Sequence, residues 1–407
     1  MNEEEGFAMK AGKGMCIAAA WISVLAAGSD ASSIPAFARK YKFSCTTCHE
    51  PFPRLKPYGA DFAGDGFNLK EKEKASDFTK TGDDMLWLNK TFPVAVRFDA
   101  FTVIEPDADV KADLQTPWGV KLLSGGALAK NIGYYFYFYM SERGEVAGIE
   151  DAYIHFDDVF GSGVDVMAGQ FQTSDPLMKR ELRLTFEDYR LYKVKPGLSS
   201  TDLTYDRGLM FLYGIEKTGT DITAMVVNGN GKGPADEETD KVDNNAFKNA
   251  GFRVAQSFGK HVSLGGFWYR GEERCPELPA WSSFAPLGDN TVTFIGPDLG
   301  LSMGPAALTA QYLRRTDSNP QFDGSTESVT EGWIAELTVV PPGDRTRWAV
   351  TALYNQVDSD LTGFDAVRTF TLNGSFLAAR NLRLGAEVTR DLERSANRFV
   401  LGLVSAF

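Results

Sequence analysis

Most of this chain alternates between apolar and polar residues with the period of two that a β-strand produces. In residues 94–100, apolar side chains occupy every second position, and Arg97 and Asp99 lie between them. Residues 382–388 repeat the pattern with charges on the polar face. Strands with one apolar and one charged face fit a barrel that has lipid outside and water inside.

The alternating segments are joined by short turns and long polar loops in regular succession. Even strand numbers, short turns at one end and long loops at the other are typical of bacterial outer-membrane barrels. We therefore predict a mainly β fold, a sixteen-stranded antiparallel outer-membrane β-barrel, with a soluble β-sandwich or propeller as the alternative. The predicted strands are residues 92–105, 116–128, 132–142, 149–157, 163–172, 207–216, 220–229, 247–257, 261–271, 290–301, 304–315, 330–340, 345–357, 365–378, 381–391 and 396–407.

Hydropathy and charge exclude two other classes of protein. Beyond the N-terminus the sequence has no run of about 18 apolar residues, which a transmembrane helix would need. The formal net charge of -12 argues against nucleic acid as a partner. The last strand places Phe399, Leu401, Leu403 and the terminal Phe407 on one face, as the assembly signal of outer-membrane barrels does.

Before the barrel, Cys45, Cys48 and His49 form the motif Cys-x-x-Cys-His. This motif attaches c-type haem, because each thiol adds to a haem vinyl group and the histidine becomes an axial ligand of the iron. The alternatives are a chance match or a redox dithiol. The chain has four cysteines and this is its single copy of the motif, so we predict one covalent haem c.

The N-terminal segments predict export followed by a small haem segment. Residues 1–33 combine two lysines with a short apolar run, which indicates a secretory signal peptide. We assign residues 34–91 to a small α-helical c-type haem segment and residues 92–407 to the barrel. Within the haem segment, Phe52, Leu55, Tyr58, Gly59 and Phe62 recur at helical spacing and predict a helix that packs on the haem.

The second axial ligand of the iron is less clear from the sequence. Met85 is the single methionine of the haem segment, and it is a candidate beside a plain packing role. His155 shares the predicted lumen face with Asp151 and Tyr153, so it is a second candidate, from the barrel wall. Five-coordinate iron remains possible. We expect His261 to be solvated.

Two sets of loop residues bear on what could reach the haem. The predicted external loops are rich in acidic residues, which would attract a divalent cation, although such loops are often charged merely to stay solvated. The loop 173–206 mixes apolar and charged residues, and we expect it to fold into the lumen, with an extra strand or hairpin as the alternative. The acidic residues are Asp107, Asp109, Asp113, Asp236, Glu237, Glu238, Asp240, Asp243, Glu272, Glu273 and Glu277.

The order Pro35-Ala36-Phe37-Ala38-Arg39, then Cys45-x-x-Cys48-His49, then Phe52-Pro53-x-Leu55-x-x-x-Gly59-x-x-Phe62 resembles the fused outer-membrane monohaem cytochrome c–porin family, of the iron-oxidising type. The resemblance covers about residues 34–67 in motif and the barrel in architecture. It implies a haem plug at the periplasmic end of a sixteen-stranded barrel in the bacterial outer membrane. Cys45, Cys48 and His49 match the haem-binding positions of the family.

The function that the resemblance implies is electron transfer, with extracellular Fe(II) as donor and a periplasmic cytochrome or other carrier as acceptor. If the chain is an enzyme, it is an Fe(II) oxidase. Electron exchange with another extracellular redox partner is one alternative. A solute porin with a structural or sensory haem is another.

Overall fold

The computed structural model describes residues 36–69, 78–79, 82–83, 88–90, 92–174, 177–235, 239–276, 285–343 and 346–407, which belong to one compact unit. The predicted signal peptide and Met85 lie outside the described residues. Among the described residues, no helix is long and apolar enough to cross a membrane.

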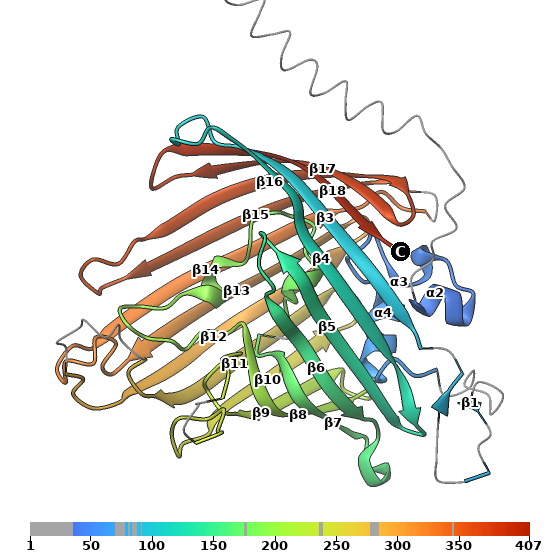
Figure 1. The fold of residues 1–407 in the computed structure, drawn as a ribbon, viewed down its shortest axis with the longest axis horizontal. Coiled ribbons are helices and arrows are strands. Elements are labelled where there is room, and N and C mark those ends of the chain that lie inside the picture. The colour runs from blue at the N-terminus through green and yellow to red at the C-terminus, as the bar shows by residue number, and fades with distance from the viewer. Residues whose placement is uncertain are drawn as a thin grey trace, which may run out of the picture. The chain divides into compact units, whose positions relative to one another are not determined.

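Residues 94–406 form a closed antiparallel barrel of sixteen strands (Figure 1). The strands are β3 (Val94–Ile104), β4 (Ala112–Ala129), β5 (Ile132–Glu142), β6 (Gly148–Phe156), β7 (Val164–Gln172), β8 (Tyr205–Ile215), β9 (Thr220–Val227), β10 (Asn249–Phe258), β11 (Val262–Glu273), β12 (Asn290–Met303), β13 (Ala306–Asp317), β14 (Ser328–Val339), β15 (Trp348–Ser359), β16 (Val367–Ala379), β17 (Leu382–Asp391) and β18 (Ala396–Ala406).

Each barrel strand pairs with its neighbours in the sequence, and the first and last strands close the ring. The closing pair runs from Ile104 opposite Phe399 to Arg97 opposite Ala406. The prediction of sixteen strands is confirmed, with each predicted strand overlapping one observed strand. The largest shift at a strand start is in β4, which begins at Ala112 instead of residue 116, ahead of a bulge in its pairing with β3.

The barrel is apolar outside and polar inside, as the alternation predicts. On β16, the hydroxyl and amide side chains of Thr369, Thr371 and Asn373 are buried, whereas Phe370 and Leu372 between them are 48% and 44% exposed. A water-soluble protein buries its apolar side chains instead. This inverted pattern is the one that a barrel shows when lipid surrounds it.

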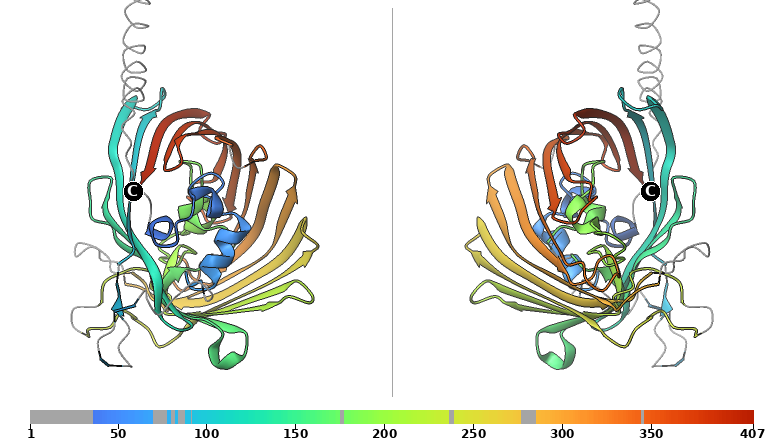
Figure 2. Two further views of the ribbon diagram at one scale, coloured as in Figure 1. Left: turned by 90° about the vertical axis from the view of Figure 1, so that its right-hand side faces the viewer. Right: turned by 90° about the vertical axis from the view of Figure 1, so that its left-hand side faces the viewer.

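The plug comprises three short helices, α2 (Ala36–Tyr41), α3 (Cys45–Cys48) and α4 (Pro57–Gly64), which lie inside the ring of strands (Figure 2). The predicted helix is shorter than its apolar spacing indicated. It begins at Pro57, a residue that suits the first helical turn, so Phe52 and Leu55 precede it in a tight loop. A two-stranded sheet, β1 (Phe78–Thr79) and β2 (Leu88–Asn89), follows.

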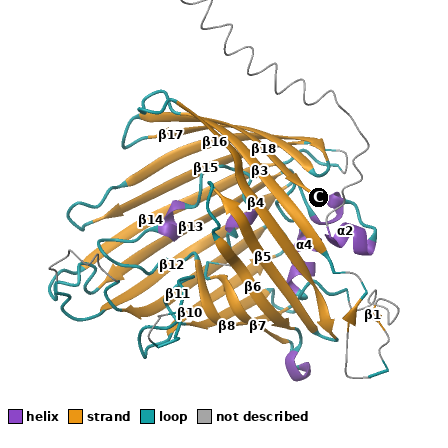
Figure 3. Cartoon of the chain, in the orientation of Figure 1, coloured by secondary structure: helices purple, strands orange, loops and turns teal. Residues whose placement is uncertain are grey.

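The loop between β7 and β8 folds into the lumen, as predicted, and its described part contains short 3-10 turns instead of a strand or hairpin (Figure 3). The turns are η3 (Arg180–Leu182) and η4 (Arg190–Lys193), and a third, η2 (Val159–Gly161), connects β6 to β7. Tyr192 of η4 donates a hydrogen bond to Gln311 on the far wall, 2.6 Å away. We call this loop, residues 177–204, the lumen loop.

Candidate functional site

The two motif cysteines lie on one helical turn. Residues i and i+3 of a helix share a face, so α3 presents the thiols of Cys45 and Cys48 on the same side. Ser44 caps this turn by accepting a hydrogen bond from the Thr46 backbone N–H. Helix α4 approaches closely at Gly59, where an added Cβ would lie 2.4 Å from the Cys48 carbonyl oxygen. The glycine therefore permits the contact that holds the motif against α4.

His49 is oriented by the tight loop that follows the motif. Its Nδ1 lies 3.0 Å from the carbonyl oxygen of Pro53 and 3.3 Å from that of Arg54. A carbonyl can only accept, so Nδ1 carries the proton and Nε2 keeps a free lone pair. Burial lowers the pKa of His49, which favours the same neutral form. This is the state in which an imidazole binds a metal.

The thiols and the imidazole line a cavity of about 520 Å³ inside the barrel, which we call the plug cavity. Its volume lies within the range of about 300–1,000 Å³ that cofactor sites occupy. Its walls are largely apolar and come from the plug, the lumen loop and the barrel. The apolar and aromatic residues include Phe37, Tyr41, Phe43, Phe52, Phe62, Phe67, Leu123, Tyr135, Tyr137, Tyr153, Leu177, Leu182 and Tyr189.

The residues of the plug cavity fit a covalently attached haem. Two thiols on one face, an imidazole with a free Nε2 and an apolar enclosure are what this group requires. The cavity also holds two buried polar atoms without hydrogen-bond partners among the described residues, the hydroxyl of Tyr137 and Nε2 of His155. Such atoms are costly unless a ligand or water satisfies them.

His155 lines the plug cavity and is 1% exposed, on the lumen face where strand phase placed it. Its ring packs against Gly66 of the plug, where an added Cβ would lie 3.1 Å from the His155 Cδ2. Its role as an axial ligand stays a prediction. The cavity wall also contains three thioethers that were not predicted, those of Met167, Met178 and Met210. Two of them, Met167 and Met210, face each other across β7 and β8, which a strand-pairing register would have revealed.

Contacts between aromatic and charged residues connect the motif to the barrel wall. The ring of Phe52 lies edge-on to the His49 imidazole, with 5.5 Å between centroids. The guanidinium of Arg97, on β3, lies 5.8 Å from the Phe52 ring centroid. Arg97 pairs with Asp99 at 2.8 Å, and Asp99 pairs in turn with Lys121, also at 2.8 Å. Arg97 and Asp99, which the alternation placed on the polar face, are thus buried in the lumen.

A second, smaller cavity of about 280 Å³ lies farther along the lumen, and we call it the charged cavity. Arg97 and Glu181 line both cavities. The wall of the charged cavity reaches Arg143 and Lys232, in the loops after β5 and β9, at the end of the barrel opposite the plug. Two stacked cavities therefore run from the plug to the opposite end of the lumen.

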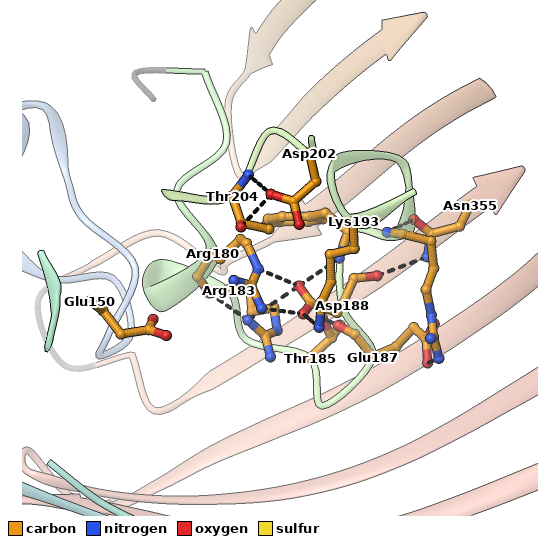
Figure 4. Close-up of polar contacts among 12 residues, drawn as sticks. Glu150, Arg180, Arg183, Thr185, Glu187, Asp188, Lys193, Asp202, Thr204 and Asn355 are labelled. Atoms are coloured by element: carbon orange, nitrogen blue, oxygen red, sulfur yellow. Dashed lines mark hydrogen bonds and ion pairs between the residues drawn. The ribbon is translucent and has the colours of Figure 1, made fainter. Parts of the chain in front are cut away.

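The lumen loop is held around Asp188 by three basic side chains (Figure 4). Arg180, Lys193 and Arg183 approach its carboxylate at 2.6, 3.1 and 3.4 Å. Burial opposes ionisation of Asp188, but Arg183 and Arg180 outweigh it and hold the pKa of this carboxyl well below its ordinary value. Asp188 is therefore a charged centre around which the loop is arranged.

The predicted acidic loops form no metal centre among the described residues, because no group of three or more His, Cys, Asp or Glu side chains gathers there. Glu273, assigned to a loop, instead ends β11 and is 3% exposed. It accepts hydrogen bonds from Thr201 and Asn290 and fastens the lumen loop to the wall. Residues 236–238 and Glu277 lie outside the described residues. His261 is exposed, as predicted.

Comparison with known proteins identifies the fold. No family model and no curated protein matches the sequence. Among solved structures, the barrel is similar to the outer membrane protein OmpT of Vibrio cholerae, with a TM-score of 0.55 at 11% identity. It is also similar to the anion-selective porin of Comamonas acidovorans, with a TM-score of 0.57 at 11% identity. Each comparison covers 78% of this chain and 99% of the other chain. OmpF of Salmonella typhi, solved with daunomycin, has a TM-score of 0.54 at 10% identity over 78% of this chain and 97% of its own.

These similarities, together with the closed antiparallel ring, define a sixteen-stranded β-barrel of the porin type. At identities this low they establish the fold alone.

Proposed function

We propose that this protein lies in a bacterial outer membrane and transfers electrons through one c-type haem, attached to Cys45 and Cys48 and ligated by His49. The observation that carries the proposal is that these three side chains line an apolar cavity inside the barrel. The fold is shared with porins, so the proposed redox function depends on this cavity and not on the fold.

The inverted surface supports the membrane location. Large apolar side chains face outward along the strands, as at Phe370 and Leu372 of β16 and Phe399 and Leu401 of β18. Such a surface would be unstable in water and is stabilised by lipid. The porin-type fold agrees with this placement. We place the plug at the periplasmic end, as the resemblance to the cytochrome–porin family implies.

The residues of the plug have separate roles in this proposal. Cys45 and Cys48 anchor the group covalently, and the loop at Pro53 holds the His49 imidazole neutral and correctly turned. The apolar wall excludes water, which tunes the reduction potential. When bound, the haem supplies reversible one-electron transfer between its ferric and ferrous states.

We assign extracellular Fe(II) as the electron donor and a periplasmic cytochrome or other carrier as the acceptor. Each Fe(II) would give up one electron and leave as Fe(III). The charged cavity supports this route, because it extends toward the end of the barrel opposite the plug and meets the plug cavity at Arg97 and Glu181. A hydrophilic donor could thus approach the haem without crossing lipid.

A solute porin with a structural haem is the second candidate, favoured by the porins that share the fold. Contacts across the lumen argue against an open channel. The lumen loop follows β7 and bonds to the far wall of the barrel, where Tyr192 donates to Gln311 of β13 and the Arg190 backbone N–H donates to Asn355 of β15. Apolar residues of the loop, including Leu191, also pack with lumen-facing side chains of the wall, including Leu353.

The test is the visible spectrum of the oxidised, detergent-purified protein before and after anaerobic addition of Fe(II). The proposal expects prompt appearance of reduced c-type bands. A haem that dithionite reduces and Fe(II) does not would reject Fe(II) as the donor and favour another redox partner. A high single-channel conductance in a planar bilayer would favour the porin.

A further inference from the structure

The wall of the charged cavity contains a buried arginine that makes no ion pair among the described residues, although Asp99 and Glu387 lie near enough to act on its charge. Arg383 of β17 is 5% exposed and lines the cavity. Among the described residues, no carboxylate lies within ion-pair distance of its guanidinium, and Nε donates no hydrogen bond. Its Nη1 donates to two neutral acceptors, the Leu184 carbonyl oxygen at 2.6 Å and the Ser375 hydroxyl at 3.0 Å. A buried charge without a counter-charge is costly unless something pairs with it.

Two further donors in the same wall lack acceptors. The indole Nε1 of Trp118, a residue that is 7% exposed, has no hydrogen-bond partner among the described residues. Nε of Arg183, in the lumen loop, has none either. Both residues line the charged cavity with Arg383. An N–H group is satisfied only by an acceptor, so these three side chains together favour water or an acceptor-bearing ligand in the cavity.

The acidic groups nearby are already engaged. Asp99 pairs with Arg97 and Lys121, and Asp188 pairs with three basic residues of the lumen loop. Glu387 accepts from the backbone N–H groups of Phe186 and Glu187, at 2.6 and 2.9 Å. Glu181 has no hydrogen-bond partner, but burial raises the pKa of its carboxyl and so favours the neutral acid. In all, eight basic and seven acidic side chains of the described residues line the charged cavity, so its surplus is positive.

We propose that the charged cavity binds a small oxyanion, held by Arg383, Arg183 and Trp118. The planar guanidinium fork matches the paired oxygens of a carboxylate or sulfate, and the indole N–H adds a neutral donor. The oxyanion is either a free inorganic ion or the carboxylate of an organic ligand that carries a metal. The site does not depend on the haem, since none of its donors belongs to the plug.

Isothermal titration of the purified full-length protein with sodium sulfate, and separately with sodium citrate, at constant ionic strength in chloride tests this site. The wild-type protein is expected to bind at least one of them. Tighter sulfate binding indicates a free inorganic ion, and tighter citrate binding indicates a carboxylate ligand. Arg383→Gln is expected to weaken binding by about tenfold or more, because a charge-assisted hydrogen bond is lost.

Trp118→Phe keeps the ring and removes one donor, so binding should weaken by several-fold, roughly the effect of one neutral hydrogen bond. Arg394→Gln, at a side chain that is 74% exposed, is the matched control and should bind as the wild type does. If neither anion binds the wild-type protein, the site does not exist. Unchanged anion affinity in Arg383→Gln would also overturn the proposed site. If Arg383→Gln fails to form a barrel, unchanged anion affinity in Trp118→Phe would overturn the site instead.

Discussion

Arg54 of the plug pairs with Glu336 of the barrel wall, with 2.9 Å between Nη1 and Oε1, although 282 residues separate them. The second oxygen of Glu336 accepts a hydrogen bond from the hydroxyl of Tyr189 in the lumen loop, 2.7 Å away. One buried carboxylate thus joins the plug, the wall and the lumen loop. The position of the haem motif in the lumen rests on contacts of this kind.

Arg54→Met should loosen the plug, because it leaves the buried Glu336 carboxylate without its cation. The expected cost is about 2–4 kcal/mol, as for other broken buried pairs. Limited proteolysis within residues 36–69 should become faster. The control is Arg314→Met, which removes a pair with Glu331 whose side chains are 49% and 43% exposed and which should cost less than about 1 kcal/mol. Equal proteolysis of both variants would refute this role of Arg54.

Gly133→Ala should displace the plug from the wall. A Cβ at Gly133 of β5 would lie 2.0 Å from the backbone oxygen of Gly66, so the plug backbone cannot keep its contact with β5. We expect a cost of roughly 1–3 kcal/mol to plug docking and a measurable rise in ion conductance in planar bilayers. Gly266→Ala on β11 is the control, since its Cβ meets nothing within 4 Å. A variant that conducts no better than the control would contradict the close approach.

His155→Ala should convert the oxidised haem from low spin to high spin, if His155 supplies the second axial ligand from the barrel wall. Two observations support this prediction: His155 is buried in the plug cavity, and its Nε2 makes no hydrogen bond among the described residues, with the Asp165 carboxylate 3.9 Å away. Electron paramagnetic resonance of the purified protein reads the spin state directly. His261→Ala, at an exposed position, should change nothing. An unaltered low-spin spectrum in His155→Ala would reassign the ligand to a thioether, with Met85→Ala the next variant, and an unaltered high-spin spectrum would indicate five-coordinate iron.

Asp188→Asn should loosen the lumen loop at neutral pH and make no difference in strong acid. The folded pKa of Asp188 lies below its ordinary value of 3.8, so its ionised form stabilises the fold above pH 3.8. This contribution is lost as the pH falls from 3.8 through the lowered folded pKa. Hydrogen exchange of the amides of residues 189–192 should be faster in the variant at pH 7, with the exposed Asp109→Asn as control. A difference that persisted unchanged at the lowest pH would disprove the electrostatic origin.

The barrel was predictable because the rule that determines it is local. The alternation in β3 and β17 records which side of the wall each residue faces, and the lumen-facing Arg97, Arg383 and His155 follow from that phase. The haem motif was equally local, because Cys45 and Cys48 lie on one helical turn and His49 directly follows it.

The contacts of the two cavities were not predictable, because they join segments far apart in the sequence. Arg383 meets Leu184 across 199 residues, and no single-sequence pattern encodes that pairing. The apolar spacing around Phe52 and Leu55 suggested a longer helix. Both residues instead lie in the loop before α4, whose Pro53 carbonyl oxygen positions His49. Glu273 appeared to be a loop residue because its strand continues two residues beyond the predicted end.

The most direct test of the account is whether haem remains with the polypeptide after denaturation. The purified protein is separated on a denaturing gel, stained for haem peroxidase activity and compared with the double variant Cys45→Ser/Cys48→Ser. We expect haem to migrate with the wild-type chain and to be absent from the variant. A wild-type chain that carries no haem, when expressed with a c-type maturation system, would contradict the proposed electron transfer and leave a porin-type barrel with a plug.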